Sequence, residues 1–461
     1  ATMERQRWNW WCEMNDERDP NDPMARWFAQ FGGDGKNFDL QQMLDQLRSA
    51  LGSVGATQLP TVDWSQTTSL AHAALLAKAS DPDPTIADDR AVADAHRLAS
   101  AWLDEFVAFE PLSTPPAAWS RSTWIEQTSA GWQSIAEPIV NRIADAMADS
   151  FGAQFQMGEG TPVEFEQFGS MLTPILRASA AQMYSVQVSK AISIIATQLL
   201  SGAELGLQLL SKPQVVMLPA NIAAFGEDLG VSEQELLLYL TLREEARQRL
   251  FAQVPWLGPQ LISLLAQYTS QITIDLSDIT DSVDVDDLQG LEPEQLSALS
   301  EDLQEQLFAP ACTAQQADVL IRMETLLDLI EGWVDATAGA AATKWLPHVA
   351  TMLDETIRRR RVTSYPADAF LSAMLGLDMR PERFREATAL WRMLEAERGI
   401  EARDKLWSHP DLLPGSAELE DPSELLGTAP GGGVEPDEID IALEKLLTEE
   451  DRHNEEGPKP D

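Results

Sequence analysis

The residues whose types and spacing point most clearly to chemistry lie in the segment 235–251, which reads ELLLYLTLREEARQRLF. Within it, Arg243, Glu244 and Arg247 occupy the defining positions of the HExxH pattern. In that pattern two histidines one helical turn apart ligate zinc, and the glutamate beside the first activates a water molecule. A guanidinium stays protonated and offers no free lone pair, so Arg243 and Arg247 cannot act as ligands. The segment therefore predicts either a metal site that has lost its ligands or an ordinary helix with a coincidental arrangement.

Further segments, in a fixed order along the chain, carry a resemblance to a known family. They are AWSRSTWIEQT at 118–128, VVMLPANIAAF at 215–225, LREEARQRLFAQVPWL at 242–257, LIEGWVDA at 329–336, RRRR at 358–361, LGLDMRPERFREATALW at 375–391 and LWSHPDLLP at 406–414. From about Trp119 to Pro414 the chain resembles the zincin-like metallopeptidase (type 2) family of actinobacterial proteins. Members of that family are described as "putative hydrolase" or as associated with deazaflavin-coenzyme biosynthesis. The resemblance implies a mainly α, multi-helical zincin-like fold with a small β element.

The resemblance also implies where a third metal ligand belongs. A later helix contains Glu331-Gly332-Trp333-Val334-Asp335. This ExxxD pattern is similar to that of glutamate zincins, in which the Glu binds zinc and the Asp one turn later orients a ligand histidine. With both histidines gone, three protein ligands cannot be assembled. We therefore predict no cofactor, although the family implies zinc.

Ion pairs between arginines and carboxylates could instead occupy the space where a zinc ion would lie. Arg243 and Arg247, on one helical face, would meet Glu331 and also Asp335, and a bidentate pair of arginine and carboxylate has the planar geometry to fit there. In the other interpretation, both arginines point to solvent and pair with Glu244, Glu245 or other surface acids.

Two classes of function follow from this site. In the first, the chain is a catalytically inactive zincin-like homologue that binds a protein, a peptide or a regulatory ligand in the old cleft. In the second, it is a hydrolase or peptidase with Glu244 as general base. General-base catalysis alone contributes about 10²–10⁴-fold, which is little for peptide hydrolysis, so we favour the first. A metal site made only of Glu244, Glu331 and Asp335 would suit Mg²⁺ or Mn²⁺, but the adjacent arginines oppose it.

Composition limits the partners and the compartment. The formal net charge of −41 and a pI near 4.3 argue against binding to nucleic-acid backbones or anionic membranes. Cys12 and Cys312 are the only cysteines and are far apart, which favours the reducing cytoplasm. The sequence has neither the layout of a signal peptide nor an uncharged apolar run of about 18 residues that would span a membrane.

The sequence predicts four parts, with the site in the third. They are an acidic, Trp-rich N-terminal arm at 1–60, a helical domain at 61–212, a zincin-like helical core at 213–413 and a disordered acidic tail at 414–461. The core begins with a short apolar strand at 215–218 between two prolines. Ser232 and Glu235 form the capping-box pattern that starts the helix of Arg243, and Pro255 ends it. The helix that carries Glu331 is predicted over 314–341.

The acidic tail contains the best candidate for a partner-binding element. Its apolar residues Ile439, Leu443, Leu446 and Leu447 recur at helical spacing, so a short helix would form on meeting a groove. The alternative is a solvated tail with a frayed helix.

The densest basic segment is the run of arginines at 358–361. Arginines near a helix C-terminus favour the helix dipole and pair with nearby acids, and this is the interpretation that we prefer. Docking of an acidic ligand is the alternative.

Overall fold

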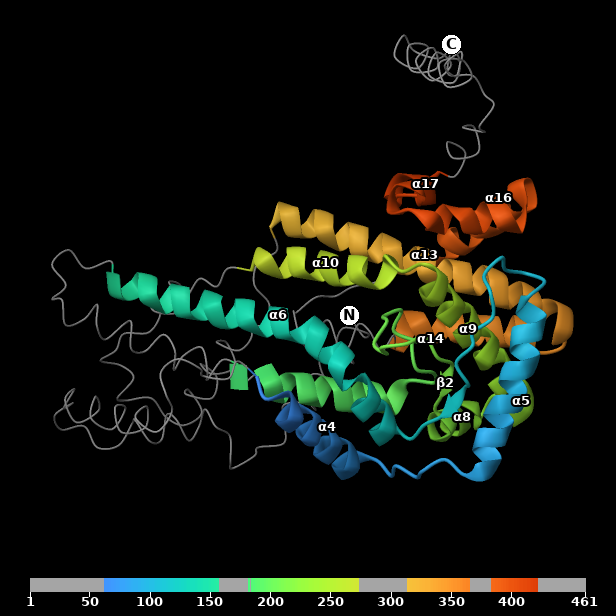
Figure 1. The fold of residues 1–461 in the computed structure, drawn as a ribbon, viewed down its shortest axis with the longest axis horizontal. Coiled ribbons are helices and arrows are strands. Elements are labelled where there is room, and N and C mark those ends of the chain that lie inside the picture. Colours follow the sequence, from blue (N-terminus) through green and yellow to red (C-terminus); the bar gives the residue numbers. More distant parts are fainter. Residues whose placement is uncertain (1–61, 157–180, 183, 273–312, 365–382, 422–461) are drawn as a thin grey trace, which may run out of the picture. The chain divides into compact units, whose positions relative to one another are not determined.

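Helices dominate the part of the chain that the structure describes (Figure 1), as the sequence predicts. The structure is a computed structural model and describes residues 62–156, 181–182, 184–272, 313–364 and 383–421. Its elements are α4 (Trp64–Lys78), α5 (Ile86–Leu103), β1 (Ala117–Ala118), α6 (Arg121–Gln156), β2 (Val216–Met217), α8 (Pro219–Gly226), α9 (Glu233–Gln253), α10 (Leu257–Ser270), α13 (Ala314–Trp345), α14 (Ala350–Ser364), α16 (Phe384–Lys405), the 3₁₀ turns η2 (Leu406–Ser408) and η3 (Pro410–Leu412), and α17 (Ser416–Glu420).

The two helices that carry the candidate site begin at capping boxes. At the start of α9, the Ser232 hydroxyl accepts a hydrogen bond from the Glu235 N–H, and the Glu235 carboxylate accepts from Ser232 in return. Helix α9 ends before Pro255, as predicted. Thr313 and Gln316 form the same arrangement at the start of α13. This helix runs to Trp345, four residues beyond its predicted end.

The β element is a two-stranded parallel sheet. Strand β2 lies inside the predicted strand at 215–218, and it pairs with β1 so that Ala117 is opposite Val216. Ser201 adds an antiparallel bridge to Met217 on β2. The sequence does not predict strand β1, because two alanines are too short a run to show an alternating apolar and polar pattern.

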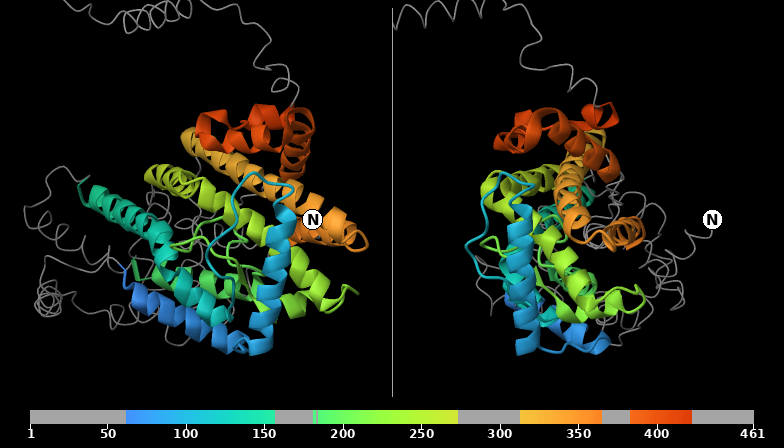
Figure 2. Two further views of the ribbon diagram at one scale, coloured as in Figure 1. Left: turned by 45° about the vertical axis from the view of Figure 1, so that its right-hand side comes forward. Right: turned by 90° about the vertical axis from the view of Figure 1, so that its right-hand side faces the viewer.

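Helix α13 lies between α16 on one side and α9 and α10 on the other (Figures 1 and 2). It approaches α16 closely at Gly332, where an added Cβ would lie 2.5 Å from the Cβ of Ala387. A larger residue at position 332 would therefore push the two helices apart. Gly332 belongs to the same short segment as Glu331, so close packing and the candidate site are set by neighbouring residues.

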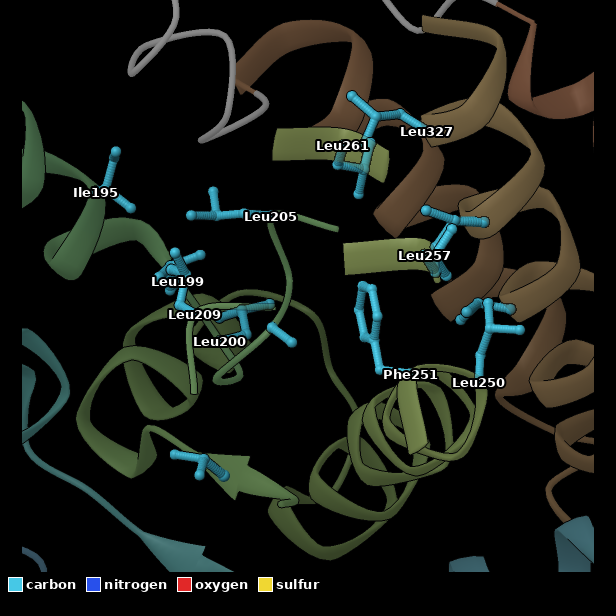
Figure 3. Packing of buried hydrophobic residues seen from close by; sticks show 14 of the residues in the cluster. Ile195, Leu199, Leu200, Leu205, Leu209, Leu250, Phe251, Leu257, Leu261 and Leu327 are labelled. Carbon is cyan, nitrogen blue, oxygen red and sulfur yellow. The ribbon is translucent and has the colours of Figure 1, made fainter. Parts of the chain in front are cut away.

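One cluster of buried apolar side chains joins the described elements. Figure 3 shows Leu250 and Phe251 near the end of α9, beside Leu257 and Leu261 of α10. The cluster extends from Ala71 to Leu419 and includes residues on both sides of the predicted boundary at 212. The division into a helical domain and a zincin-like core stays a prediction.

Several predicted features fall outside the described residues. These are the N-terminal arm at 1–60 and the four apolar residues of the tail, Ile439, Leu443, Leu446 and Leu447. Helix α17 lies within the range assigned to the tail and buries Leu419. Among the helices described, none is both long and apolar enough to cross a membrane.

Candidate functional site

The structure brings the four residues of the predicted degenerate metal site together with Glu244, the candidate general base. Arg243, Glu244 and Arg247 come from α9, and Glu331 and Asp335 come from α13. Residues four apart lie on one face of a helix, so each helix presents its residues to the other. All five are buried, and none is more than 4% exposed. The interpretation in which both arginines point to solvent is therefore wrong, because the packing of α9 against α13 encloses them.

Arg247 and Glu331 form a two-point ion pair. Nε of Arg247 donates to Oε1 of Glu331 at 2.9 Å, and Nη2 donates to Oε2 at 3.1 Å. This parallel arrangement is the strongest geometry available to a guanidinium and a carboxylate. It fixes the relative position of α9 and α13 at the place where the HExxH pattern would put its second histidine.

Arg243 and Asp335 make the second contact between the same helices. Nη1 of Arg243 donates to Oδ1 of Asp335 at 2.8 Å, and its Nη2 lies 3.8 Å from Oε2 of Glu331. Burial alone would raise the pKa of Asp335. The charge of Arg243 and hydrogen bonds from Arg243 and Arg358 outweigh that effect and hold the pKa below its usual value. Asp335 is therefore ionised at neutral pH.

Glu244, the residue in the position of a general base, is fully enclosed by hydrogen-bond donors. Its Oε2 accepts from Ser201 Oγ at 2.7 Å and from Arg247 Nη1 at 2.9 Å. Its Oε1 accepts from the Ala203 N–H at 3.1 Å and from Gln248 Nε2 at 2.8 Å. With four donors around a side chain that has no exposed surface, the Glu244 carboxylate joins the 201–203 turn to α9.

Helix α14 supplies residues that the sequence did not assign to the site. Within its run of four arginines, Arg358 donates to Oδ2 of Asp335 at 2.8 Å, and Arg361 forms an ion pair with Glu331. Arg360 instead pairs with Glu204. The run does lie near the C-terminus of its helix and does pair with acids, as expected, but two of these acids belong to the buried site. The i, i+3 spacing of Arg358 and Arg361 is the only signal that the sequence gives for their joint role.

A tyrosine and an aspartate extend the same network. The Tyr239 hydroxyl, on α9, donates to Oδ1 of Asp354 on α14 at 2.5 Å. Burial raises the pKa of Tyr239 far above its ordinary value, with the neighbouring carboxylates adding to the effect, so the phenol stays neutral. Sequence reasoning missed this pair, because a single Tyr and a single Asp carry no spacing signal.

The opposite face of α9 holds a separate charged group. Glu245 accepts from His96 Nε2 at 3.1 Å and from Arg249 Nε at 2.8 Å. Arg249 also reaches Asp104 at 2.8 Å and the hydroxyl of Ser100 at 2.8 Å, which ties α9 to α5 and to the residue after it. Helix α9 is thus held by ion pairs on two sides.

The donor set does not fit a zinc ion. Arginines stand at both histidine positions, and both oxygens of Glu331 and of Asp335 accept from guanidinium groups. Within the described ranges, no group of three or more His, Cys, Asp and Glu side chains is arranged to hold a metal. The carboxylate-only site for Mg²⁺ or Mn²⁺ finds no support for the same reason, since guanidiniums already fill the space between its carboxylates.

Comparisons with known proteins agree with this mainly helical fold. The zincin-like metallopeptidase family matches residues 62–426, and the chain belongs to that family. A crystal structure of "a putative hydrolase with a novel fold" from Chloroflexus aurantiacus is similar in fold, with a TM-score of 0.55 and 18% sequence identity. The match covers 81% of this chain and 100% of that one. No curated protein matches the chain.

Proposed function

We propose that this chain is a catalytically inactive member of the zincin-like metallopeptidase family that acts by binding a partner. The observation that carries the proposal is the buried two-point pair between Arg247 and Glu331, at the positions of a ligand histidine and of the implied third ligand. The guanidinium of Arg247 cannot ligate zinc, because it stays protonated and has no free lone pair. Its positive charge also neutralises Glu331, the implied third ligand. Ion pairing takes the place of metal as the link between the two helices.

The surroundings of Glu244 weigh against the alternative, a hydrolase that uses this residue as general base. A general base must reach the proton of a water or a substrate with a free lone pair. Glu244 instead accepts four hydrogen bonds from groups of the protein, one of them from Arg247.

Two parts of the chain are candidates for the partner contact. One is the region of the former metal site between α9, α13 and α14. The other is the acidic tail with Ile439, Leu443, Leu446 and Leu447, whose helical spacing would suit a groove on a partner. The scarcity of cysteine supports a cytoplasmic setting for both.

Metal analysis of the purified protein tests the proposal. We would measure metal content by inductively coupled plasma mass spectrometry on chain purified without chelator, beside the Arg243→His/Arg247→His variant. We expect no stoichiometric metal in the native chain. In the variant we expect about one zinc per chain, the stoichiometry of a three-ligand site.

A matched control separates ligand replacement from loss of charge. The Arg243→Gln/Arg247→Gln variant removes the same charges and supplies no imidazole, so it should stay free of zinc. Stoichiometric metal in the native chain would overturn the proposal, and assays of hydrolase activity with Glu244→Gln as reference would then follow.

A further inference from the structure

We infer that the paired acids of α13 are a receptor for a basic helical segment with two arginines at positions i and i+3, and that the chain's own α14 occupies this receptor. The partner class is a helical peptide or protein segment with the pattern Arg-x-x-Arg. The inference rests on the proposed function, because it takes the former metal site as a place for binding and not for catalysis.

Each acid of α13 is held by one arginine from α9 and one from α14. Glu331 binds Arg247 of α9 and Arg361 of α14. Asp335 binds Arg243 of α9 through Oδ1 and Arg358 of α14 through Oδ2. The contacts of α9 come from a helix buried along most of its length, whereas those of α14 come from a helix with an exposed outer face.

The hold of α14 on the site depends largely on charge. Within 350–361, only Ala350, Leu353 and Ile357 are buried apolar residues. Its polar contacts with the site include the two arginines and the hydrogen bond between Tyr239 and Asp354. Beside the site, Arg360 pairs with Glu204 and donates to the Gln198 carbonyl, so these contacts too depend on charged groups. Such a small apolar face is within reach of a peptide, and the arginine contacts set its position.

Removal of α14 would leave the inner pairs in place. Arg247 would still bind both oxygens of Glu331, and Arg243 would still bind Oδ1 of Asp335. Each acid would therefore keep a positive partner. Breaking a buried ion pair is costly when it leaves one charge without a partner, and that would not happen here. Oδ2 of Asp335 would keep only the 3.4 Å hydrogen bond from the Thr388 hydroxyl. It and one side of Glu331 could then accept new guanidinium groups at the spacing that Arg358 and Arg361 now satisfy.

The chemistry of the site selects arginine and a basic partner. Residues three apart lie on one face of a helix, which matches two acids four apart on α13. A planar guanidinium meets a carboxylate better than the ammonium of lysine does. The net charge of −41 would also speed the approach of any positively charged segment.

The test places α14 in competition with its own sequence. The labelled peptide ATMLDETIRRRRVTS, residues 350–364, is titrated into the full native chain and into the full-length Arg358→Gln/Arg361→Gln variant, with binding followed by fluorescence anisotropy. Because a site that is mostly occupied internally shows a reduced apparent affinity, the variant should bind the peptide at least about tenfold more tightly than the native chain.

Two control peptides make the readout specific. A peptide with Arg359→Gln should bind as well as the native sequence, because Arg359 is 75% exposed and pairs with Glu355 of α14 itself. A peptide with Arg358→Gln and Arg361→Gln should lose binding. Equal binding of the two control peptides, or no preference for the variant chain, would overturn the inference.

A second measurement keeps the inference testable if the variant chain does not fold. Circular dichroism reports folding, and hydrogen exchange is then measured on the native chain with excess peptide. If the peptide competes with α14, hydrogen exchange across 350–361 should become faster with the native peptide and stay the same with the doubly substituted peptide. Unchanged exchange with both peptides would overturn the inference. Metal content is independent of these outcomes, so failure here is distinct from failure of the proposed function.

Discussion

At the scale of single residues, Asp328 is the most unusual acid near the site. It lies one turn before Glu331 on α13, is 2% exposed, and its Oδ1 has no hydrogen-bond partner among the residues described. Burial raises its pKa to about 7, the backbone N–H of Arg383 opposes this, and the charge of Glu324 adds to it. Arg361 also faces it and lowers the pKa. Unlike Asp335, it lacks a guanidinium that holds it firmly ionised.

This environment predicts a pH-dependent loss of stability. A carboxyl group whose pKa is raised in the folded state costs nothing below its unfolded value, and its cost grows as pH rises toward the folded value. The Asp328→Asn variant removes the titration. It should be more stable than the native chain at pH 8, by up to about 4 kcal/mol, and the advantage should vanish near pH 4.

Denaturant unfolding at both pH values, followed by tryptophan fluorescence, checks this expectation. Asp94→Asn is a suitable control, because the Asp94 side chain on α5 is 70% exposed and its partner, Arg97, stays protonated at both pH values. The same stability difference at pH 4 and pH 8 would contradict the argument.

Residue spacing predicted part of the site and missed the rest for a physical reason. The i, i+4 spacings of Arg243 with Arg247 and of Glu331 with Asp335 place each pair on one helical face, so their contact followed once the two helices were taken as neighbours. The partners Arg358 and Arg361 could not be chosen in this way. An arginine run near many acids is compatible with numerous pairings, and only the fold decides among them.

At the scale of elements, the ion pairs act as a clamp between three helices. Glu331 of α13 stands between Arg247 of α9 and Arg361 of α14, and all three side chains are at least nine-tenths buried. Removal of the carboxylate takes this acceptor from two buried guanidiniums, although Arg247 keeps its hydrogen bond to Glu244. We therefore expect Glu331→Ala to lower the free energy of unfolding by about 3–5 kcal/mol.

Thermal and denaturant unfolding measure this loss, and two further variants define its origin. Glu331→Gln keeps the side-chain volume and one acceptor oxygen. Its free energy of unfolding should therefore lie between those of the native chain and of Glu331→Ala. Glu355→Ala removes an acid of α14 that pairs with the exposed Arg359, and it should leave the melting temperature unchanged. A native-like melting temperature for Glu331→Ala would show that the clamp does not hold the helices.

Element boundaries were predictable where local chemistry decides them. The capping box at Ser232 and Glu235 and the proline at 255 define α9 from sequence alone. The pairing of β1 with β2 was not predictable, because two alanines at 117–118 gain their strand geometry from the partner strand and not from their own pattern. The position of α14 over α13 likewise depends on contacts distant in sequence.

At the scale of the whole molecule, charge and family membership divide the chain. The family match covers 62–426, so it ends before the acid-rich residues of the tail. The tail carries the same sign of charge as the chain as a whole, and like charges oppose its docking on the body. This is consistent with the proposal that its apolar residues at helical spacing meet another protein.

This arrangement predicts that partner capture depends on the tail and on its apolar face. In a pull-down from cell extract, the full chain should recover partners that a chain ending at Pro430 does not recover. The full-length Leu443→Ser/Leu446→Ser variant should show the same loss, since it removes apolar anchors and keeps every acid. Glu449→Gln/Glu450→Gln, which lowers charge and keeps the anchors, is the matched control and should retain capture. Equal recovery by the native, truncated and Leu→Ser chains would exclude the tail and leave the site beneath α14 as the candidate for partner binding.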